Sequence, residues 1–293
     1  MSITSARSRR IPAAVAALAA ALVAPLLAAS PAGADSAGTA SAGTDSGAVS
    51  GAVSGTAAVT LPPAHAGFDY QIGGAYTPPA GVTVVSRDRE SAPAPGLYNI
   101  CYVNAFQVQP DEIDEWDDDL LLRDANGDVI IDEDWEEAIL DISTAAKRTR
   151  IAEKVNGWID GCASSGFQAV EPDNYDSYDR SQGKFGTSAA MAFITQLSAH
   201  AHGKGLAIAQ KNTADLAEYR STTGLDFAVA EECGEWNECD TYTDAFGADV
   251  IVIEYTAKGL STACAGWKDT LSIVRRDLNV VPLGGKGYLR QTC

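Results

Sequence analysis

Short runs of apolar residues alternate along the chain with longer stretches in which apolar residues recur at helical spacing. Because strands that alternate with helices form parallel sheets with right-handed crossovers, this pattern predicts an α/β fold. The predicted helices are Ser143–Ser164, Thr187–His202, Thr213–Tyr219 and part of Ser261–Leu278. The predicted strands are Phe68–Gly73, Val82–Ser86, Leu97–Ala105, Ile139–Ile142, Phe167–Glu171, Leu206–Gln210, Phe227–Ala230, Val250–Glu254 and Val280–Leu283.

The first 60 residues lack this alternation. Met1–Ala34 joins a basic start to an Ala-rich apolar run and a small-residue cleavage site, which is typical of a secretory signal. A membrane-spanning helix is the alternative reading, although the run is slightly short for one. Residues 35–60 are mostly Ala, Ser, Gly, Thr and Val, a composition that predicts a flexible linker. The folded domain is therefore expected at residues 61–293, the size of one α/β barrel or one large doubly wound domain.

The cysteine content fits an exported protein. The chain has six cysteines, an even number that favours disulfides in an oxidising compartment. We predict that Cys233 and Cys239 close a small loop, and the other pairings stay open. No CxxC occurs, and the three histidines lie far in sequence from most of the cysteines, so we predict no metal site.

The formal net charge is −18, which disfavours binding to nucleic acid and favours cationic ligands. Acidic surfaces also keep secreted proteins soluble, so the charge alone does not identify a partner. No G-x-S-x-G, G-x-G-x-x-G or P-loop motif is present. We therefore expect neither a serine triad nor a nucleotide cofactor.

Polar side chains follow the carboxyl ends of most predicted strands. The densest stretch is Gly166–Tyr178, GFQAVEPDNYDSY, where an apolar run breaks at Pro172, a residue that cannot donate to a sheet ladder. An acidic turn without function is the alternative reading of this stretch alone. Because parallel strands end at the same crevice, we expect the polar side chains at one mouth. The candidates are Asp88, Tyr102, Asp141, Glu171, Asp173, Asn174, Asp176, Lys211, Asn212, Glu231, Glu254 and Tyr255.

Several carboxylates without a set of His or Cys ligands favour acid–base chemistry over zinc hydrolysis. Glycoside hydrolysis uses one carboxylic acid to protonate the leaving oxygen and a second carboxylate to attack the sugar or activate water. The sequence motifs resemble those of glycoside hydrolase family 114, the endo-α-1,4-polygalactosaminidases, from about Phe68 to about Tyr255. The matching motifs are Tyr98–Tyr102 (YNICY), Leu140–Ile142, Gly166–Tyr178, His200, Lys211-Asn212, Phe227–Cys233 (FAVAEEC) with Cys239, and Ile253–Tyr255.

The resemblance implies a (β/α)8 barrel whose catalytic Asp and Glu follow the fourth and sixth strands. Phe68–Gly73 is then one extra N-terminal strand outside the closed sheet, and the catalytic residues are Asp173, as nucleophile, and Glu231, as general acid and base. The family pattern usually has Gln where this chain has Glu232, and often has Asp where this chain has Gln168. The implied substrate-binding residues are Asp88, Tyr102, Asp141, Glu171, Asn174, Asp176, Lys211, Asn212, Glu254 and Tyr255.

We therefore expect a secreted monomeric enzyme that needs no cofactor and cleaves a cationic polysaccharide with retention of configuration. It should bind neither nucleic acid nor, once the signal is removed, a membrane. The roles of Asp173 and Glu231 could be exchanged, and a wider separation of the two carboxyl groups would indicate inversion instead. Two alternatives to the function itself also stay open. One is a non-catalytic carbohydrate-binding barrel, and the other is an α-glycosidase of different specificity.

Overall fold

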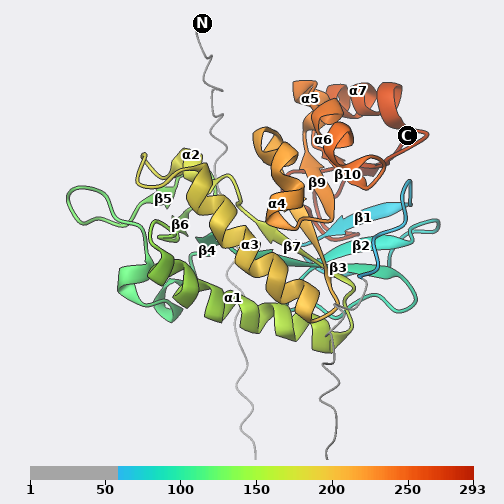
Figure 1. Ribbon diagram of the computed structural model, residues 1–293. Helices are drawn as coiled ribbons and strands as arrows, with labels where there is room; N and C mark the ends of the chain where they lie inside the picture. The colour runs from blue at the N-terminus through green and yellow to red at the C-terminus, as the bar shows by residue number, and fades with distance from the viewer. Residues whose placement is uncertain (1–58) are drawn as a thin grey trace, which may run out of the picture. The chain divides into compact units, whose positions relative to one another are not determined.

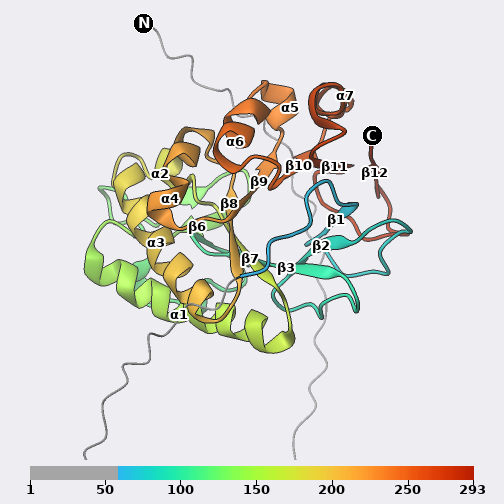
Figure 2. The same ribbon diagram turned by 45° about the vertical axis from the view of Figure 1, so that its right-hand side comes forward.

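A curled sheet of nine strands forms the centre of the structure, a computed structural model that describes residues 59–293 (Figures 1 and 2). The first eight strands are parallel to one another, and the ninth is antiparallel to the eighth. The predicted barrel-type α/β fold is confirmed. In spatial order the strands are β1 (Phe68–Gln71), β2 (Val84–Asp88), β3 (Tyr98–Asn104), β7 (Ala169–Asp173), β8 (Ala207–Lys211), β9 (Phe227–Glu231), β10 (Val250–Glu254), β11 (Ser272–Arg276) and β12 (Arg290–Gln291).

Helices connect the strands from β3 to β11, whereas β1, β2 and β3 follow one another through loops, as do β11 and β12. The two long helices α1 (Ala145–Ser165) and α3 (Thr187–Gly203) confirm two of the predicted helices and pack against each other (Figure 1). Thr144 caps α1, because its Oγ1 accepts the Lys147 N–H at 3.3 Å. The remaining helical segments are η1 (Ile113–Glu115), η2 (Asp118–Leu120), α2 (Ser177–Arg180), η3 (Ala214–Tyr219), α4 (Arg220–Thr223), α5 (Cys233–Trp236), α6 (Cys239–Phe246) and α7 (Ala257–Trp267).

The barrel strands are not all formed by the segments that the sequence predicted. The sequence places Phe68–Gly73 outside the sheet, but β1 pairs with β2 and contacts β11, so it is the first barrel strand. Ile139–Ile142 is not a barrel strand, since β6 (Glu137–Ile139) belongs to a separate antiparallel sheet with β4 (Gln107–Val108) and β5 (Ile131–Asp132). The two differences cancel, and β7 and β9 remain the fourth and sixth strands.

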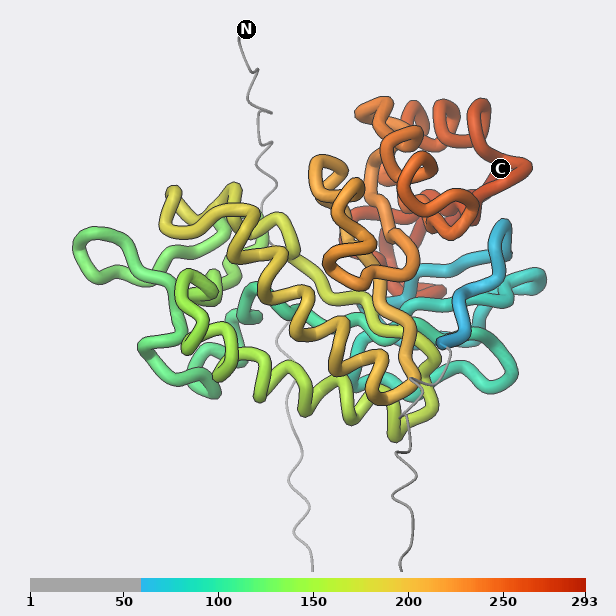
Figure 3. The backbone as a smooth tube through the Cα atoms, in the orientation of Figure 1, coloured from blue at the N-terminus to red at the C-terminus, as the bar shows by residue number. Residues whose placement is uncertain are grey.

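The eighth strand was also misplaced, since Val280–Leu283 is not a strand and Ser272–Arg276 is. The sequence pattern did not indicate β11 because the strand ends in two arginines, which are rare in buried strands. In the structure Arg276 is fully buried against Asp69 of β1, with 3.5 Å between Nη1 and Oδ1. The C-terminal segment then returns to the start of the sheet, where Arg290 donates to the Phe68 carbonyl at 2.8 Å (Figure 3). These contacts join the two ends of the sheet.

Apolar side chains form two clusters on the two faces of the curled sheet. Ile100 packs in one cluster, with Phe68 and Phe227, while its neighbours Cys101 and Val103 belong to the other cluster, with residues of α1 and α3. This division follows from the alternation of side chains along a strand. The same alternation decides which polar residues at the strand ends can face the mouth of the barrel.

All six cysteines form disulfides: Cys101–Cys162, Cys233–Cys239 and Cys264–Cys293. The predicted small loop is confirmed. Each bridge is expected to stabilise the fold by about 2–4 kcal/mol. No helix among residues 59–293 is both long and apolar enough to cross a bilayer. The predicted signal and most of the predicted linker lie outside the described residues.

Candidate active site

A cavity of about 390 Å³ opens at the carboxyl ends of the barrel strands. The sequence-based candidates that line it come from six strands and the loops that follow them. They are Asp88, Tyr102, Asp173, Asn174, Asp176, Asn212, Glu231 and Tyr255. Parallel strands end at one edge of the sheet, so residues far apart in sequence meet there.

Asp173, the last residue of β7, is held by three donors. Its Oδ2 accepts the Tyr102 hydroxyl at 2.7 Å, and its Oδ1 accepts the Asn174 N–H at 2.8 Å and lies 3.1 Å from Lys211 Nζ. Burial acts to raise the pKa of Asp173, but Lys211 and the hydrogen bonds outweigh it and hold the pKa below its usual value. Asp173 is therefore ionised at neutral pH, as a nucleophile requires.

Glu231, the last residue of β9, is held on both oxygens. Its Oε1 accepts the Tyr255 hydroxyl, and its Oε2 accepts the Asn212 amide at 3.0 Å and lies 3.4 Å from Lys211 Nζ. Asn212 also accepts the Glu231 N–H at 2.8 Å, which fixes the backbone next to the carboxylate. Glu232 does not line the cavity, so Glu231 is the member of this pair that faces it.

Lys211 lies beneath the two carboxylates, with its side chain only 1% exposed. Its Nζ contacts Asp173, Glu231 and also Glu171, at 3.1 Å, and donates to Tyr70. Burial acts to lower the pKa of Lys211, but the three carboxylates raise it well above the usual value. A permanent ammonium ion therefore holds the two cavity-facing carboxylates in place.

Left-handed backbone follows three adjacent strands at this edge. Asn174, Asn212 and Glu232, which directly follow β7, β8 and β9, have φ of 64°, 50° and 59°. Such conformations cost free energy in residues other than glycine, and they occur often at functional sites. Here they turn the chain sharply, and the turn at Asn174 brings its N–H back onto the Asp173 carboxylate.

Four candidates from the sequence do not line the cavity. Lys211 and Glu171 lie below it, and the fully buried Glu171 accepts hydrogen bonds from Ser86 at 2.6 Å and from Tyr70 at 3.0 Å. Burial raises the pKa of Glu171. Asp141 lies outside the barrel, where it accepts the Ser143 N–H and pairs with Lys147 at 2.5 Å.

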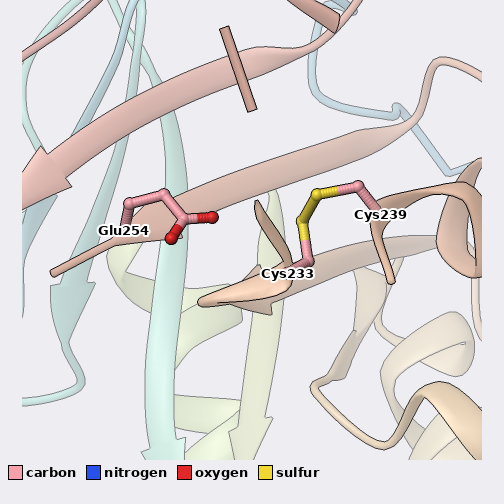
Figure 4. Close-up of side chains that lie close together, drawn as sticks. All are labelled: Cys233, Cys239 and Glu254. Carbon is pink, nitrogen blue, oxygen red and sulfur yellow. A yellow bond between two sulfur atoms is a disulfide. The ribbon is translucent and has the colours of Figure 1, made fainter. Parts of the chain in front are cut away.

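The fourth is Glu254, which alternation places on the outer face of β10 while Tyr255 faces the cavity. Its Oε1 accepts the Gly234 N–H at 2.7 Å, and burial raises its pKa to about 7. The carboxylate points toward the Cys233–Cys239 disulfide (Figure 4). One oxygen and the two sulfur atoms lie within 4.8 Å of one another, but sulfurs joined in a disulfide offer no thiolate to a metal.

Gly259 in α7 is expected to be essential for stability because Glu254 fills the space beside it. A Cβ at Gly259 would lie 2.0 Å from Glu254 Oε2, whereas a Cβ at Gly266, in the same helix, would meet nothing within 4 Å. We predict that Gly259→Ala lowers the free energy of unfolding by at least about 1–3 kcal/mol. Gly266→Ala should raise it by about 0.5–1 kcal/mol. Denaturant unfolding measures both, and equal shifts would contradict the packing described.

Sequence reasoning missed the part of the cavity wall that lies between β3 and α1. This segment, residues 105–144, carries the β4–β5–β6 sheet and lies beside α2 (Figure 1), to which the Arg180–Asp132 ion pair of 2.9 Å joins it. Its length and acidity were the only signals in the sequence. It contributes five lining residues: Gln109, Asp132, Asp134, Trp135 and Glu137.

Comparisons with known proteins agree with this architecture. The model of glycoside-hydrolase family GH114 matches residues 49–293. The fold is similar to that of Ega3 from Aspergillus fumigatus, solved in complex with galactosamine, with a TM-score of 0.65, 22% identity, and coverage of 80% of this chain and 98% of that one. It is also similar to the glycoside hydrolase domain of PelA from Pseudomonas aeruginosa (TM-score 0.53, 14% identity, coverage 75% and 96%). A comparison with curated proteins gave no match.

Proposed function

The chain belongs to glycoside-hydrolase family GH114, and we propose that it is an endo-acting enzyme that cleaves α-1,4-linked polymers of galactosamine and N-acetylgalactosamine. One observation carries the proposal. Asp173 and Glu231 end the fourth and sixth barrel strands, face one cavity and contact the same buried lysine. This is the two-carboxylate arrangement that glycoside hydrolysis requires.

The charge of the cavity supports a cationic substrate. Seven carboxylate residues line it, and Arg180 is the only lysine or arginine among its lining residues in the described part of the chain. Clefts lined by one sign of charge attract ligands of the opposite sign, and a galactosamine polymer carries ammonium groups. Ega3, which has a similar fold, was solved with galactosamine bound. The seven residues are Asp88, Asp132, Asp134, Glu137, Asp173, Asp176 and Glu231.

We infer a retaining mechanism, with which the upper limit on the distance between the two carboxylates is compatible. Asp173 Oδ1 and Glu231 Oε2 lie 3.1 and 3.4 Å from Lys211 Nζ, so these two oxygens can be no further apart than the sum of those distances, 6.5 Å. Retaining enzymes hold the two carboxyl groups at roughly 5–5.5 Å, and inverting enzymes at roughly 6.5–9.5 Å. In this mechanism Asp173 attacks the anomeric carbon, and Glu231 first protonates the leaving oxygen and then activates water.

We also infer that the enzyme works outside the cytoplasm. Three disulfides join all six cysteines, which is typical of proteins from oxidising compartments. The expected secretory signal at Met1–Ala34 agrees with this location.

Digestion of partly deacetylated poly-α-1,4-galactosamine, followed by mass spectrometry, tests the proposal. Short oligomers from the cationic polymer, and none from neutral α-linked polysaccharides, are the expected result. Proton NMR of the first product should show the α anomer, as retention predicts. Cleavage of neutral polymers alone would favour an α-glycosidase of other specificity. Binding without any cleavage would favour a non-catalytic carbohydrate-binding barrel.

A further inference from the structure

The wall formed by residues 105–144 brings to the cavity a carboxylate that the two-carboxylate mechanism does not use. Glu137, at the start of β6, lines the cavity, and its Oε2 accepts the Asn174 amide at 3.3 Å. Asn174 also donates its N–H to Asp173. A single residue therefore links Glu137 to the proposed nucleophile, and a sugar at the reacting position would lie close to both, because both line one cavity.

Four of the seven carboxylates that line the cavity contact a lysine or arginine, whereas Glu137, like Asp88, forms no such pair in the described part of the chain. Lys211 contacts Asp173 and Glu231, and Arg180 pairs with Asp176 at 2.7 Å and with Asp132 at 2.9 Å. Glu137 forms no ion pair with any lysine, arginine or histidine among residues 59–293. A partly buried carboxylate without a cation is costly, and a cation that enters the cavity would relieve that cost.

The raised pKa of Glu137 agrees with the absence of a cation paired with its carboxylate. Burial raises its pKa to about 7; the Asn104 amide and Arg180 act to lower it, whereas Asp173 and Asp132 act to raise it. Together with Asn174, whose amide donates to Glu137, these are the polar and charged groups that face it from β3, α2, β7, β5 and the turn after β7. A bound ammonium ion would favour the ionised form, so binding of a cationic sugar should release a proton from Glu137 near neutral pH.

An aromatic side chain completes the same wall. Trp135 lines the cavity two residues before Glu137, and it is 53% exposed. Large exposed aromatic side chains offer a flat apolar face against which a sugar ring can stack. A ring placed on Trp135 could direct a polar substituent to Glu137, because both side chains line one cavity.

We propose that Glu137 pairs with the 2-ammonium group of a bound galactosamine unit and thereby selects deacetylated units beside the cleaved bond. The inference rests on the proposed function and adds to it the residue that distinguishes an amine from an acetamide. An acetamide is neutral and larger, so it would leave the carboxylate without a cation and would crowd this wall.

The test compares two α-1,4-linked oligomers of equal length, one fully deacetylated and one fully N-acetylated. Wild type should show a higher kcat/KM for the deacetylated oligomer. Glu137→Gln should reduce that preference about 10- to 100-fold, as expected for loss of a charge-assisted hydrogen bond. Glu137→Asp, which keeps the charge, should restore part of it. Glu133→Gln is the matched control, because it removes one exposed charge from the same segment and should leave the preference unchanged.

The pH dependence separates recognition from a merely structural role. Glu137 is neutral below about pH 7 and ionised above it. The wild-type preference should therefore rise as the pH increases through 7 for as long as the substrate amine stays protonated, and Glu137→Gln should not show this rise. Equal losses on both oligomers, or a preference that Glu137→Gln leaves unchanged, would overturn the assignment. If folded wild type cleaves neither oligomer, the proposed function fails first, and this inference fails with it.

Discussion

Asp173→Asn and Glu231→Gln should each remove nearly all cleavage of the galactosamine polymer while the protein stays folded. Loss of a general acid costs about 10²- to 10⁴-fold in rate, and loss of the nucleophile should cost at least as much, because no covalent intermediate can form. Both side chains are partly exposed at the cavity, at 17% and 21%, so amide replacements should preserve the fold. Oligomer release measured by mass spectrometry gives the activity, and circular dichroism checks the fold.

The two roles can be distinguished with a substrate whose leaving group needs no proton. On an α-galactosaminyl fluoride, Glu231→Gln should lose much less activity than on the polymer, and Asp173→Asn should lose activity on both. The opposite pattern would exchange the two roles. Glu232→Gln is the matched control, because Glu232 adjoins Glu231 but does not line the cavity. Full activity in Asp173→Asn would show that the catalytic pair is wrong.

Lys211→Met should damage both stability and activity. The substitution leaves Asp173, Glu171 and Glu231 together without the ammonium ion that each contacts within 3.4 Å. Breaking a buried charge arrangement by removing one partner costs about 3–5 kcal/mol of the free energy of unfolding. Activity should fall as well, because without Lys211 the pKa of Asp173 rises and less of the nucleophile is ionised.

The stability of Lys211→Met should also depend on pH, and the direction of that dependence can be predicted. In Lys211→Met the buried carboxyls should have pKa values above those of the unfolded chain, so the folded state binds more protons between the two values. Stability should then fall as the pH rises from about 4 to 7. Lys204→Met is the control, because Lys204 pairs with Asp160 at the surface at 2.9 Å and its loss should cost less than about 1 kcal/mol. A Lys211→Met protein as stable as wild type at pH 7 would contradict the role of Lys211.

The sequence was most informative where local signals agree with the final structure. The apolar runs before Asp173 and Glu231 are barrel strands, and the periodic stretches at α1 and α3 are helices. Side-chain period and strand length are local properties, so they can be read from neighbouring residues. Because parallel strands end at one edge, the local pattern also predicted that both carboxylates lie at one mouth.

What the sequence by itself determined, then, was the alternation of strands and helices, the acidic strand ends and the Cys233–Cys239 loop. The tertiary structure alone decided the rest, because it depends on contacts between distant residues. The closing of the sheet decided which face of β10 is inside, so that alternation along the strand places Tyr255 in the cavity and Glu254 outside it, and the closing also buried Lys211 among three carboxylates. Packing of residues 105–144 against α2 brought Glu137 to the cavity, a position that no nearby residue indicates.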